Sequence, residues 1–593
     1  MKRLTFLFVL LFFCSCMVFT QTLDEVNWEV EDAEKEHQKL IDQLDSDIDD
    51  DEKEVTDDSI TNSIKNKYKV KKLEYDIKKL KERRVVLEKK KSENVRIVYP
   101  RTTNFKLKAL FDKVPVIDKK VKAPMAKVML LDDNVESWYA RWYMITQAKK
   151  SIDIVYFALF DDAFGRAFMG LLQEKARQGV KVRFLVDNRG GLDTTLRLTS
   201  KDILIELAKT PNLDIKVYNP IFKKFLRIFT KGLKSVWTAN HDKLVIIDEK
   251  WVMTGGRNIW GHFFADYKDD EKGYLDTDVL IKTVRGKDIG LAATKAFEDE
   301  YNLKQSNALK PSFIDRFGAS ALKKKIEYAR RTMEMFMFGD MSLVPTNENE
   351  AEYNEELSKY TVMKGGYMEF YKKIDRYFKS SSASDVYPTK LLDKGSQFKE
   401  HKIENQITEN MMSFFRAAQD EIFIQNPYII LVPKTREVLV NAAKRGVKIK
   451  IFTASPTSTD ELFVQGLFIE EWKDLFRDIP GITIHVTKKR PLHSKVFIID
   501  HQLVIAGTYN LDPLSQNMNS EIVAAIYAPR FAKIVEMSIA DRIKKYGVEY
   551  KFAIAPDGRE QVIYGPLDHC DAKTLKKIKY FYRPVAKILR PLL

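Results

Sequence analysis

The chain has 593 residues, too many for one compact core and enough for two or three domains with extensions. Its net charge of +15 is unevenly spread, because residues 24–58 carry 17 acidic and 3 basic side chains and the remainder therefore sums to +29. That surplus favours an anionic partner, either membrane phospholipid or nucleic acid. Three cysteines, two of them in the N-terminal apolar segment, exclude a disulfide framework or a zinc cluster.

Residues 1–21 have the pattern of an export signal. Lys2 and Arg3 precede an apolar run, Leu4–Phe13, which is short for a membrane span. The run leads into Cys16, which resembles the lipidated cysteine of bacterial lipoproteins. Cleavage after Thr20 and a retained anchor are the alternatives. We expect an exported, periplasmic and membrane-associated protein, with Cys16 as the candidate for lipidation.

Residues 22–98 form a highly charged extension. Its acidic first half is followed by a basic second half, in which apolar residues from Val70 to Leu87 recur at steps of three and four. That spacing predicts a helical or coiled-coil stripe. We interpret the extension as a spacer between a membrane and the folded domains, either folded back on itself or solvated.

From about residue 125 short apolar runs alternate with helical segments. The predicted strands and helices of this region are Ser151–Phe157, Val180–Val186, Leu213–Val217, Leu244–Ile247 and Trp251–Met253, with helices at Glu136–Lys149 and Gly165–Gln178. Such alternation predicts an α/β fold with a largely parallel sheet covered by helices.

The same series of elements is then repeated. Glu421–Gln425 parallels Ser151–Tyr156, and Asn441–Phe452 parallels Glu174–Leu185. His493–Asn510 likewise parallels His241–Asn258, so three matched blocks recur in the same order. We therefore predict two lobes, at 125–304 and 401–550, joined by a connector with some helix at 305–400.

The C-terminal segment 551–593 combines basic and apolar residues. Within it, Ala572–Leu593 interleaves lysine and arginine with leucine, isoleucine, tyrosine and phenylalanine. This pattern fits an interfacial membrane helix broken by Pro584, or a closing helix packed on the core. Ile221–Val236 has the same character, and two such segments favour the membrane interpretation.

Each repeat contains a His-x-Lys-x4-Asp motif, and these motifs carry the predicted chemistry. They are His241, Lys243 and Asp248 in the first repeat, and His493, Lys495 and Asp500 in the second. On a strand, residues two apart share a face, so each histidine lies beside its lysine. A phosphodiester needs a nucleophile, an acid for the leaving oxygen and positive charge for the other oxygens. Two half-sites brought together supply a pair of each.

The expected roles follow from this chemistry. One histidine attacks phosphorus and the other protonates the leaving oxygen, while Lys243 and Lys495 hold the phosphoryl oxygens. Asn258 and Asn510 add hydrogen bonds, and Gly256 and Gly507 let the backbone approach the bound group. Asp248 and Asp500 are expected to orient the site from behind the histidines. No metal or other cofactor is needed, because the lysines supply the positive charge.

With these motifs the sequence resembles the phospholipase D superfamily, and most of all its bacterial phosphatidylserine, phosphatidylglycerophosphate and cardiolipin synthase branch. The supporting sequences are Thr254–Asn258 with Asp276-Thr277-Asp278, Asn510–Ser515 with Asn519-Ser520-Glu521, Tyr218-Asn219-Pro220, and Leu589–Leu593. The resemblance covers the chain from about residue 125 onward. The resemblance does not include the 22–98 extension. In the first motif, Asp242 departs from the sequence that is usual in the family.

The resemblance implies two tandem α/β/α lobes related by a pseudo-twofold axis and a covalent phosphohistidine intermediate. It implies that Asp278 and Glu521 hydrogen-bond the catalytic histidines, and by family precedent His241 is the nucleophile and His493 the acid. The expected partner is an anionic phospholipid in a membrane surface, acted on by a monomeric catalytic unit, and nucleic acid is an unlikely substrate. A hydrolytic phospholipase or nuclease, and an inactive membrane-binding scaffold, are the competing hypotheses.

Overall fold

The computed structural model describes residues 103–116, 124–190, 198–219, 238–285, 288–309, 320–339, 348–380, 385–396, 405–459, 461–555 and 558–584. The predicted export signal with Cys16, the 22–98 extension and the basic segment 221–236 lie outside these residues. Across the described part, no helix is both long enough and apolar enough to span a bilayer.

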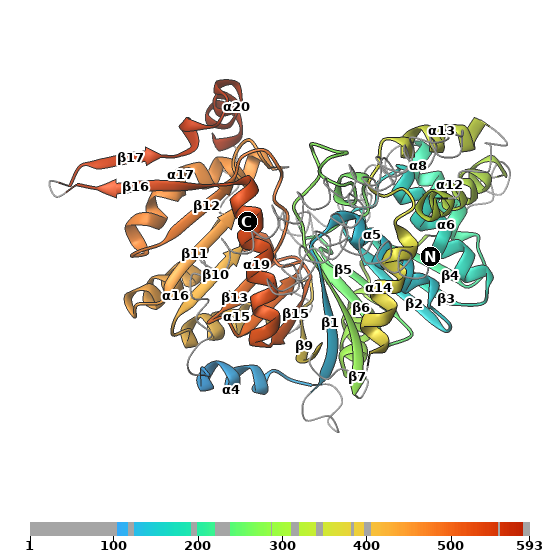
Figure 1. Cartoon of the computed structure of the whole chain (residues 1–593), viewed down its shortest axis with the longest axis horizontal. Helices are drawn as coiled ribbons and strands as arrows, with labels where there is room; N and C mark the ends of the chain where they lie inside the picture. Colours follow the sequence, from blue (N-terminus) through green and yellow to red (C-terminus); the bar gives the residue numbers. More distant parts are fainter. Residues whose placement is uncertain are drawn as a thin grey trace, which may run out of the picture. The chain divides into compact units, whose positions relative to one another are not determined.

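The first lobe is a mixed sheet whose strands follow the order β1, β7, β6, β5, β2, β3, β4, β8 (Figure 1). The strands are β1 (Met125–Leu131), β2 (Ser151–Tyr156), β3 (Lys181–Asp187), β4 (Leu213–Tyr218), β5 (Lys243–Ile247), β6 (Trp251–Gly255), β7 (Asp278–Arg285) and β8 (Ser306–Ala308). All five strands expected from the sequence are present in this lobe.

The second lobe repeats this order as β15, β14, β13, β10, β11, β12, followed by the hairpin of β16 and β17. The strands are β10 (Glu421–Gln425), β11 (Lys448–Thr453), β12 (Thr483–Thr487), β13 (Val496–Ile499), β14 (Leu503–Gly507), β15 (Glu521–Tyr527), β16 (Gly547–Ile554) and β17 (Glu560–Tyr564). The duplication predicted from the three sequence blocks is therefore a duplication of sheet topology.

The expectation of a largely parallel sheet was wrong. Only β2, β3 and β4, and their counterparts β10, β11 and β12, run parallel, whereas β5, β6 and β7 join antiparallel. A parallel crossover needs a dozen or more residues, but three residues separate β5 from β6. The short spacing within each motif therefore requires a hairpin.

The region 305–400 contributes a strand, β9 (Val386–Lys394), that belongs to both sheets. Its first residues pair with β1 and the rest of it pairs with β15, both antiparallel. The same region holds three helices, α12 (Ser320–Phe338), α13 (Glu348–Ser358) and α14 (Tyr367–Lys379). Backbone hydrogen bonding thus runs from one lobe to the other through the segment expected only to connect them.

Helices cover both faces of the sheets, in three apolar cores. The outer face of the first sheet packs on α5 (Asn134–Thr146), α6 (Ala163–Arg177), α8 (Leu198–Ala208), α12 and α14, and the outer face of the second packs on α15 (Gln406–Ala417), α16 (Pro433–Lys444) and α17 (Leu462–Asp478). A third core lies between the sheets and includes α11 (Asp288–Tyr301) and α19 (Pro529–Tyr546). This shared core holds the two halves of the site in register.

Short elements complete the described chain. They are α4 (Phe105–Lys113), a 3-10 turn at Gly261–Phe263, α18 (Pro513–Asn517), a 3-10 turn at Pro566–Asp568, α20 (Ala572–Lys577) and a π-helical turn, η5, at Ile578–Tyr582. The segment from Ala572, expected to be an interfacial helix broken by Pro584 or a closing helix on the core, is helical as far as the structure describes it, with a π turn following the short α-helix.

Candidate active site

The two His-x-Lys pairs occupy matching positions at the start of β5 and just before β13. His241 and His493 are buried, and each lysine side chain folds back on its own motif. Lys243 Nζ donates to the carbonyl oxygen of His241 at 2.9 Å, and Lys495 Nζ donates to that of His493. The alternation predicted from the sequence therefore places each ammonium beside its imidazole.

Backbone hydrogen bonds join the two lobes next to each motif. In the first bridge, Ser520 N donates to the Ala239 carbonyl at 3.1 Å, two residues before His241. In the second, His493 N donates to the Leu275 carbonyl at 2.9 Å. Each motif is thereby aligned beside the segment that leads into β15 or β7 of the other lobe.

The acid that contacts each histidine comes from the opposite lobe. His241 Nδ1 lies 3.0 and 3.1 Å from the two carboxylate oxygens of Glu521. His493 Nδ1 lies 2.8 Å from Asp276 Oδ2. Both acids are fully buried, so neither contact is screened by solvent. Because each lobe supplies the histidine of one pair and the acid of the other, neither lobe forms a complete half-site alone.

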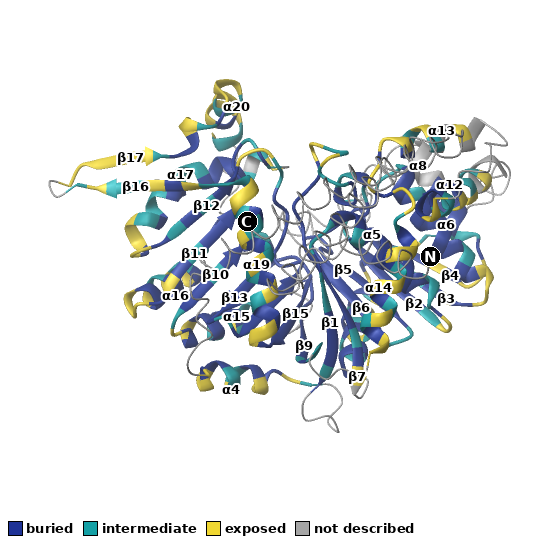
Figure 2. Ribbon diagram, viewed as in Figure 1, coloured by how far each residue is buried: buried dark blue, intermediate teal, exposed yellow. Residues whose placement is uncertain are grey.

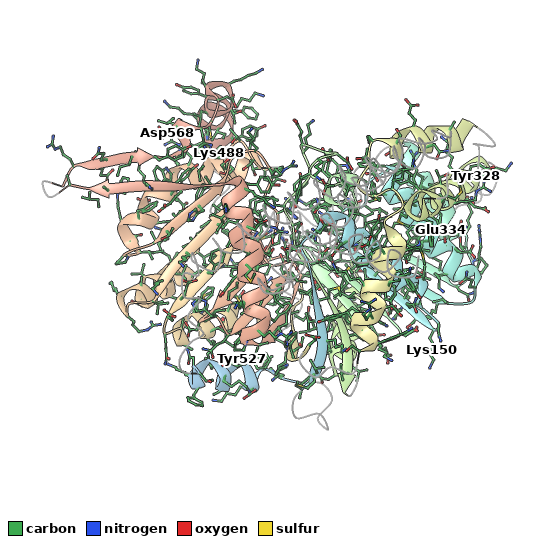
Figure 3. All side chains as sticks on the ribbon, in the orientation of Figure 1. Lys150, Tyr328, Glu334, Lys488, Tyr527 and Asp568 are labelled. Carbon is green, nitrogen blue, oxygen red and sulfur yellow. The ribbon has the colours of Figure 1, made fainter. Side chains whose placement is uncertain are left out.

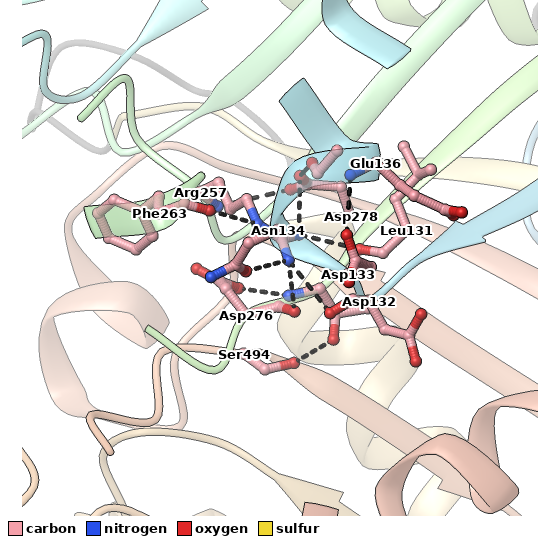
Figure 4. A network of polar contacts seen from close by, with 12 residues as sticks. Leu131, Asp132, Asp133, Asn134, Glu136, Arg257, Phe263, Asp276, Asp278 and Ser494 are labelled. Atoms are coloured by element: carbon pink, nitrogen blue, oxygen red, sulfur yellow. Dashed lines mark hydrogen bonds and ion pairs between the residues drawn. The ribbon is translucent and has the colours of Figure 1, made fainter. Parts of the chain in front are cut away.

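Asp278, which was expected to contact a catalytic histidine, does not do so. Its carboxylate pairs with Arg257 Nη1 and Arg141 Nη1, both at 3.0 Å, and accepts from Ser137 Oγ at 2.6 Å. Figure 4 shows Arg257 at the centre of this polar network, with Asn134 and Asp276 around it.

Asp278 was expected in place of Asp276 because the sequence alone does not show the register of the strands. Gly255 pairs with Asp278, and its counterpart Gly507 pairs with Val523. Two residues earlier in each strand are Asp276 and Glu521, which are therefore the true equivalents. Asp276 and Asp278 are two residues apart, so alternation alone could not distinguish them. Aligning the two glycines with their partner strands would have found Asp276.

The glycines next to the motifs make room for the neighbouring strand. A β-carbon on Gly256 would lie 2.1 Å from Asp276 Oδ1, and one on Gly507 would lie 2.3 Å from the Ile522 carbonyl oxygen. The structure shows a packing role for both glycines, and their approach to a bound group stays a prediction. Gly256 in particular leaves the space that the carboxylate of Asp276 occupies beside His493.

Asn258 and Asn510 are buried next to the two half-sites, 7% and 5% exposed. Asn258 Oδ1 accepts from Ala158 N at 3.2 Å, which orients the amide. Asn510 Oδ1 has no hydrogen-bond partner among the residues that the structure describes. A buried, unsatisfied amide oxygen costs free energy, so Asn510 is the more suited of the two to meet an incoming donor.

Asp248 and Asp500 do not reach the histidines from behind, as the sequence had suggested. They lie at the far ends of β5 and β13, where each begins a two-residue turn with positive φ, at Asp248-Glu249 and Asp500-His501. Five residues of strand separate Asp248 from Lys243, about 16 Å. Their place in the motif reflects the turn that closes each hairpin.

The carboxylates of these turn residues bind backbone amides that precede the neighbouring strand. Asp248 accepts from the amides of Lys149, Lys150 and Ser151 at 2.7–2.9 Å. Asp500 accepts from the amides of residues 419–421 and from Asn104 Nδ2 at 2.6 Å. Their role in the structure is to anchor the starts of β2 and β10.

The electrostatics of the first half-site favour an unprotonated imidazole. Burial, followed by the charges of Lys243 and Lys495, holds the pKa of His241 well below its usual 6.5. Burial also raises the pKa of Glu521 to about 7, against the opposing effect of Lys243. Burial and Lys495 lower the pKa of Lys243 to about 7. A bound anionic phosphate would favour the charged form of Lys243.

The second half-site has the opposite character. Burial would raise the pKa of Asp276, but His493, Lys495 and Arg257 together hold that pKa well below its usual range. An ionised carboxylate 2.8 Å from an imidazole stabilises its charged imidazolium form. The site therefore combines a histidine held neutral with a histidine whose partner acid supports a proton.

Aromatic rings surround both histidines. The ring of Phe157 lies 5.0 Å from that of His241, and Lys243 Nζ lies 5.2 Å from the same ring. Phe263 and Tyr274 lie 5.2 and 5.9 Å from His493. Phe263 and Tyr274 could not be assigned to the site from the sequence, because they lie in a 3-10 turn and a loop.

Asp242, the residue at which the first motif departs from the usual sequence of the family, is buried rather than facing solvent. It is 3% exposed, and its Oδ1 has no hydrogen-bond partner within the described ranges. Burial and then the charges of Asp393, Glu300 and Glu521 raise its pKa well above the usual value. The first half-site therefore rests on a cluster of acids that the second lacks at the matching position, which is Ser494.

Known proteins resemble both the lobes and the whole fold. The family described as "Cardiolipin synthase, PLD-like domain" matches the chain twice, over residues 143–271 and 411–542. An uncharacterized protein of Helicobacter pylori is 26% identical over 436 residues, covering 70% of this chain and 79% of its own length. Cardiolipin synthase C of Escherichia coli is 23% identical over 430 residues, covering 68% and 82%.

A solved structure shares the same architecture. The crystal structure of phosphatidylserine synthase from Haemophilus influenzae matches with a TM-score of 0.50 at 12% identity, covering 82% of this chain and 96% of that one. At that identity the likeness concerns the fold alone. Each of the two family matches contains one His-x-Lys motif, so the repeated unit and the duplicated half-site coincide.

Proposed function

The chain belongs to the phospholipase D superfamily, with a cardiolipin synthase-type domain in each lobe, and on this premise we propose that it transfers phosphatidyl groups between phospholipid alcohols. The observation that carries the proposal is the crossed pairing of His241 with Glu521 and His493 with Asp276. It supports one site with two histidines of different protonation, which a two-step displacement at phosphorus requires.

In the first step, Nε2 of His241 attacks phosphorus. A phosphorus–nitrogen bond forms, the bond from phosphorus to the headgroup oxygen breaks, and that oxygen takes a proton from the imidazolium of His493. Glu521 at Nδ1 of His241 and Asp276 at Nδ1 of His493 leave the Nε2 atoms as the reacting nitrogens. The low pKa of His241 supports its choice as nucleophile.

In the second step, His493 acts as a base. It removes a proton from the acceptor hydroxyl, which attacks phosphorus and breaks the phosphorus–nitrogen bond. With the hydroxyl of a second phosphatidylglycerol the product is cardiolipin, and with water it is phosphatidic acid. Lys243, Lys495, Asn258 and Asn510 would stabilise the charge that develops on the non-bridging oxygens.

The buried aromatic surroundings favour transfer over hydrolysis. Phe157, Phe263 and Tyr274 pack against the two histidines, and His241 and His493 are 8% and 5% exposed. Limiting the access of water to a phosphohistidine leaves more time for an alcohol to react.

The proposal is tested by incubating purified protein with phosphatidylglycerol vesicles and identifying the lipid products by mass spectrometry. We expect cardiolipin and free glycerol in equal amounts, and no product from a His241→Ala/His493→Ala double variant. Phosphatidic acid as the sole product would replace transfer by hydrolysis. Turnover by the double variant would show that the active site lies elsewhere.

A further inference from the structure

The last described part of the second lobe exposes large apolar side chains that do not pack into any of the apolar cores described above. Ile554, Ile563, Leu567, Tyr580 and Phe581 are 54%, 56%, 81%, 69% and 66% exposed. Isolated exposed apolar residues are common, but here five large ones fall within 28 residues. Figure 2 shows β17 and the helix α20 as mostly exposed, whereas β16 is largely of intermediate exposure.

Lysines accompany these residues. Lys573, Lys576, Lys577 and Lys579 are all exposed on α20 and η5, while the nearest acid, Asp571, caps the helix by accepting from Thr574 N at 2.8 Å. Lys576 and Lys577 precede Tyr580 by four and three residues, so all three share a helix face. Basic and aromatic side chains on one face are the composition of a surface that meets anionic headgroups.

The exposed elements are firmly attached at their base. Ile578 is buried, Arg583 forms an ion pair with Glu470 of α17, and a β-carbon on Gly466 would lie 3.3 Å from the Arg583 backbone. On the hairpin, Phe552 packs on Trp472, with 6.0 Å between ring centroids. The exposed side chains are thus presented by an anchored support.

The base of this region leads to the second catalytic motif. Lys488 Nζ lies 5.8 Å from the ring of Tyr564, and Lys488 N donates to the Tyr546 carbonyl at 2.9 Å. Figure 3 shows Lys488 close to Asp568 in this view. From Lys488 only five residues of chain lead to His493. A membrane bound to this region would therefore lie at the same end of the second lobe as the chain segment that leads into the second motif.

We propose that Ile554, Ile563, Leu567, Tyr580, Phe581 and the lysines at 573, 576, 577 and 579 form a surface that docks the enzyme on an anionic phospholipid membrane. The rings and aliphatic side chains enter the headgroup region, and the lysines bind lipid phosphates. Residues 585–593 add Lys587, Arg590 and six further apolar residues to the same end of the chain. The proposal rests on the proposed function, since both require a phospholipid substrate.

The test is flotation of the full-length protein with vesicles of phosphatidylcholine containing phosphatidylglycerol. Two variants remove the surface: one changes Leu567, Tyr580 and Phe581 to Ser, and the other changes the four lysines to Gln. We expect at least about 10-fold weaker partitioning for each, with the lysine variant losing its dependence on phosphatidylglycerol and on salt. The matched control is Phe105→Ser on α4, where Phe105 is 79% exposed and should not affect partitioning.

Two further measurements separate this proposal from the proposed function. Turnover of a short-chain, monomeric phosphatidylglycerol should be unchanged in both surface variants, and the His241→Ala/His493→Ala variant should bind vesicles as the unmodified protein does. Unchanged partitioning of both surface variants would overturn the docking surface even if lipid turnover is found. Loss of binding to DNA, rather than to vesicles, in the lysine variant would also overturn it.

Discussion

The two half-sites have the same plan but different electrostatics. Each histidine is held at Nδ1 by an acid from the other lobe, and each lysine donates to the carbonyl of its own histidine. However, the first acid is Glu521, whose pKa is raised to about 7, and the second is Asp276, whose pKa is held well below normal. The duplication places two imidazoles in equivalent positions, but the charges around them give the two half-sites different electrostatic environments.

The largest expected effect comes from removing either histidine. His241→Ala and His493→Ala should each lower kcat by about 10³-fold or more, because nucleophile and acid act in the same step. His501→Asn is the matched control, since His501 pairs with Glu536 on the surface and Asn also tolerates its positive φ. Assays of phosphatidylglycerol turnover would check this. An active single variant would mean that one half-site suffices.

Replacing the two crossed acids should separate the half-sites. Asp276→Asn removes an ionised carboxylate and should lower kcat about 10–100-fold, whereas Glu521→Gln should cost less, because the raised pKa makes that carboxyl partly neutral near pH 7. Kinetics of both variants at pH 7 would check the order. Equal losses would contradict the proposed difference between the half-sites.

The pH profiles of these variants sharpen the same comparison. With the pKa of His241 below 6.5, the acidic limb of kcat/KM should lie below pH 6.5. Glu521→Gln should move that limb little, because Glu521, with its pKa raised to about 7, is already mostly neutral below pH 6.5. Asp276→Asn destabilises the imidazolium of His493 and should move the alkaline limb to lower pH. A shift of the acidic limb by Asp276→Asn would reverse the assignment of nucleophile and acid.

The turn aspartates should affect stability rather than catalysis. Asp500→Asn should lower the free energy of unfolding by about 1–3 kcal/mol, because buried amide donors lose part of their acceptor. Asp248→Asn should cost less, since Asp248 accepts from the three backbone amides named above and is less buried than Asp500. Urea unfolding measures both. A kcat loss as large as that of the histidine variants would place these residues in the chemistry after all.

The only stabilising effect is expected from Asp242→Asn. An acid whose pKa is raised on folding removes stability as pH increases from 3.8 through the raised pKa. The variant should therefore be more stable than the unmodified protein at pH 8, by about 1.4 kcal/mol per unit of pKa difference, and equal to it near pH 3.8. Urea unfolding across that range, with the exposed Asp474→Asn as control, would check this. Lower stability at pH 8 would contradict it.

The sequence predicted the repeated elements and the motif pairs because both depend on local patterns. Strands such as Ser151–Tyr156 are short segments rich in β-branched and apolar residues, and His-x-Lys alternation does not depend on the rest of the fold. The crossed acids depend instead on strand register and on bridges such as Asn240 with Ser520, which join residues 280 positions apart. For this reason Asp278 was chosen over Asp276, although the two differ by only two residues.

The misassigned roles of Asp248 and Asp500 have a similar cause. A repeated motif shows which residues recur together, but it does not show why. The turn residue Asp248 and the reacting residue His241 both recur in the second repeat, although their roles differ. Only the distances distinguish a residue that ends a hairpin from one that meets the substrate. The same holds for β9, which looks like part of a linker until its pairing with β1 and β15 is known.

The most direct test of the central claim is to locate the covalent intermediate. Protein incubated with phosphatidylglycerol is quenched during turnover, digested and analysed by mass spectrometry under conditions that preserve phosphohistidine. A phosphatidyl group on His241, absent from His493 and accumulating when His493 is changed to Ala with a substrate that carries a good leaving group, is the predicted result. A phosphatidyl group on His493 instead, or equal labelling of both histidines, would contradict the division of roles between the two half-sites.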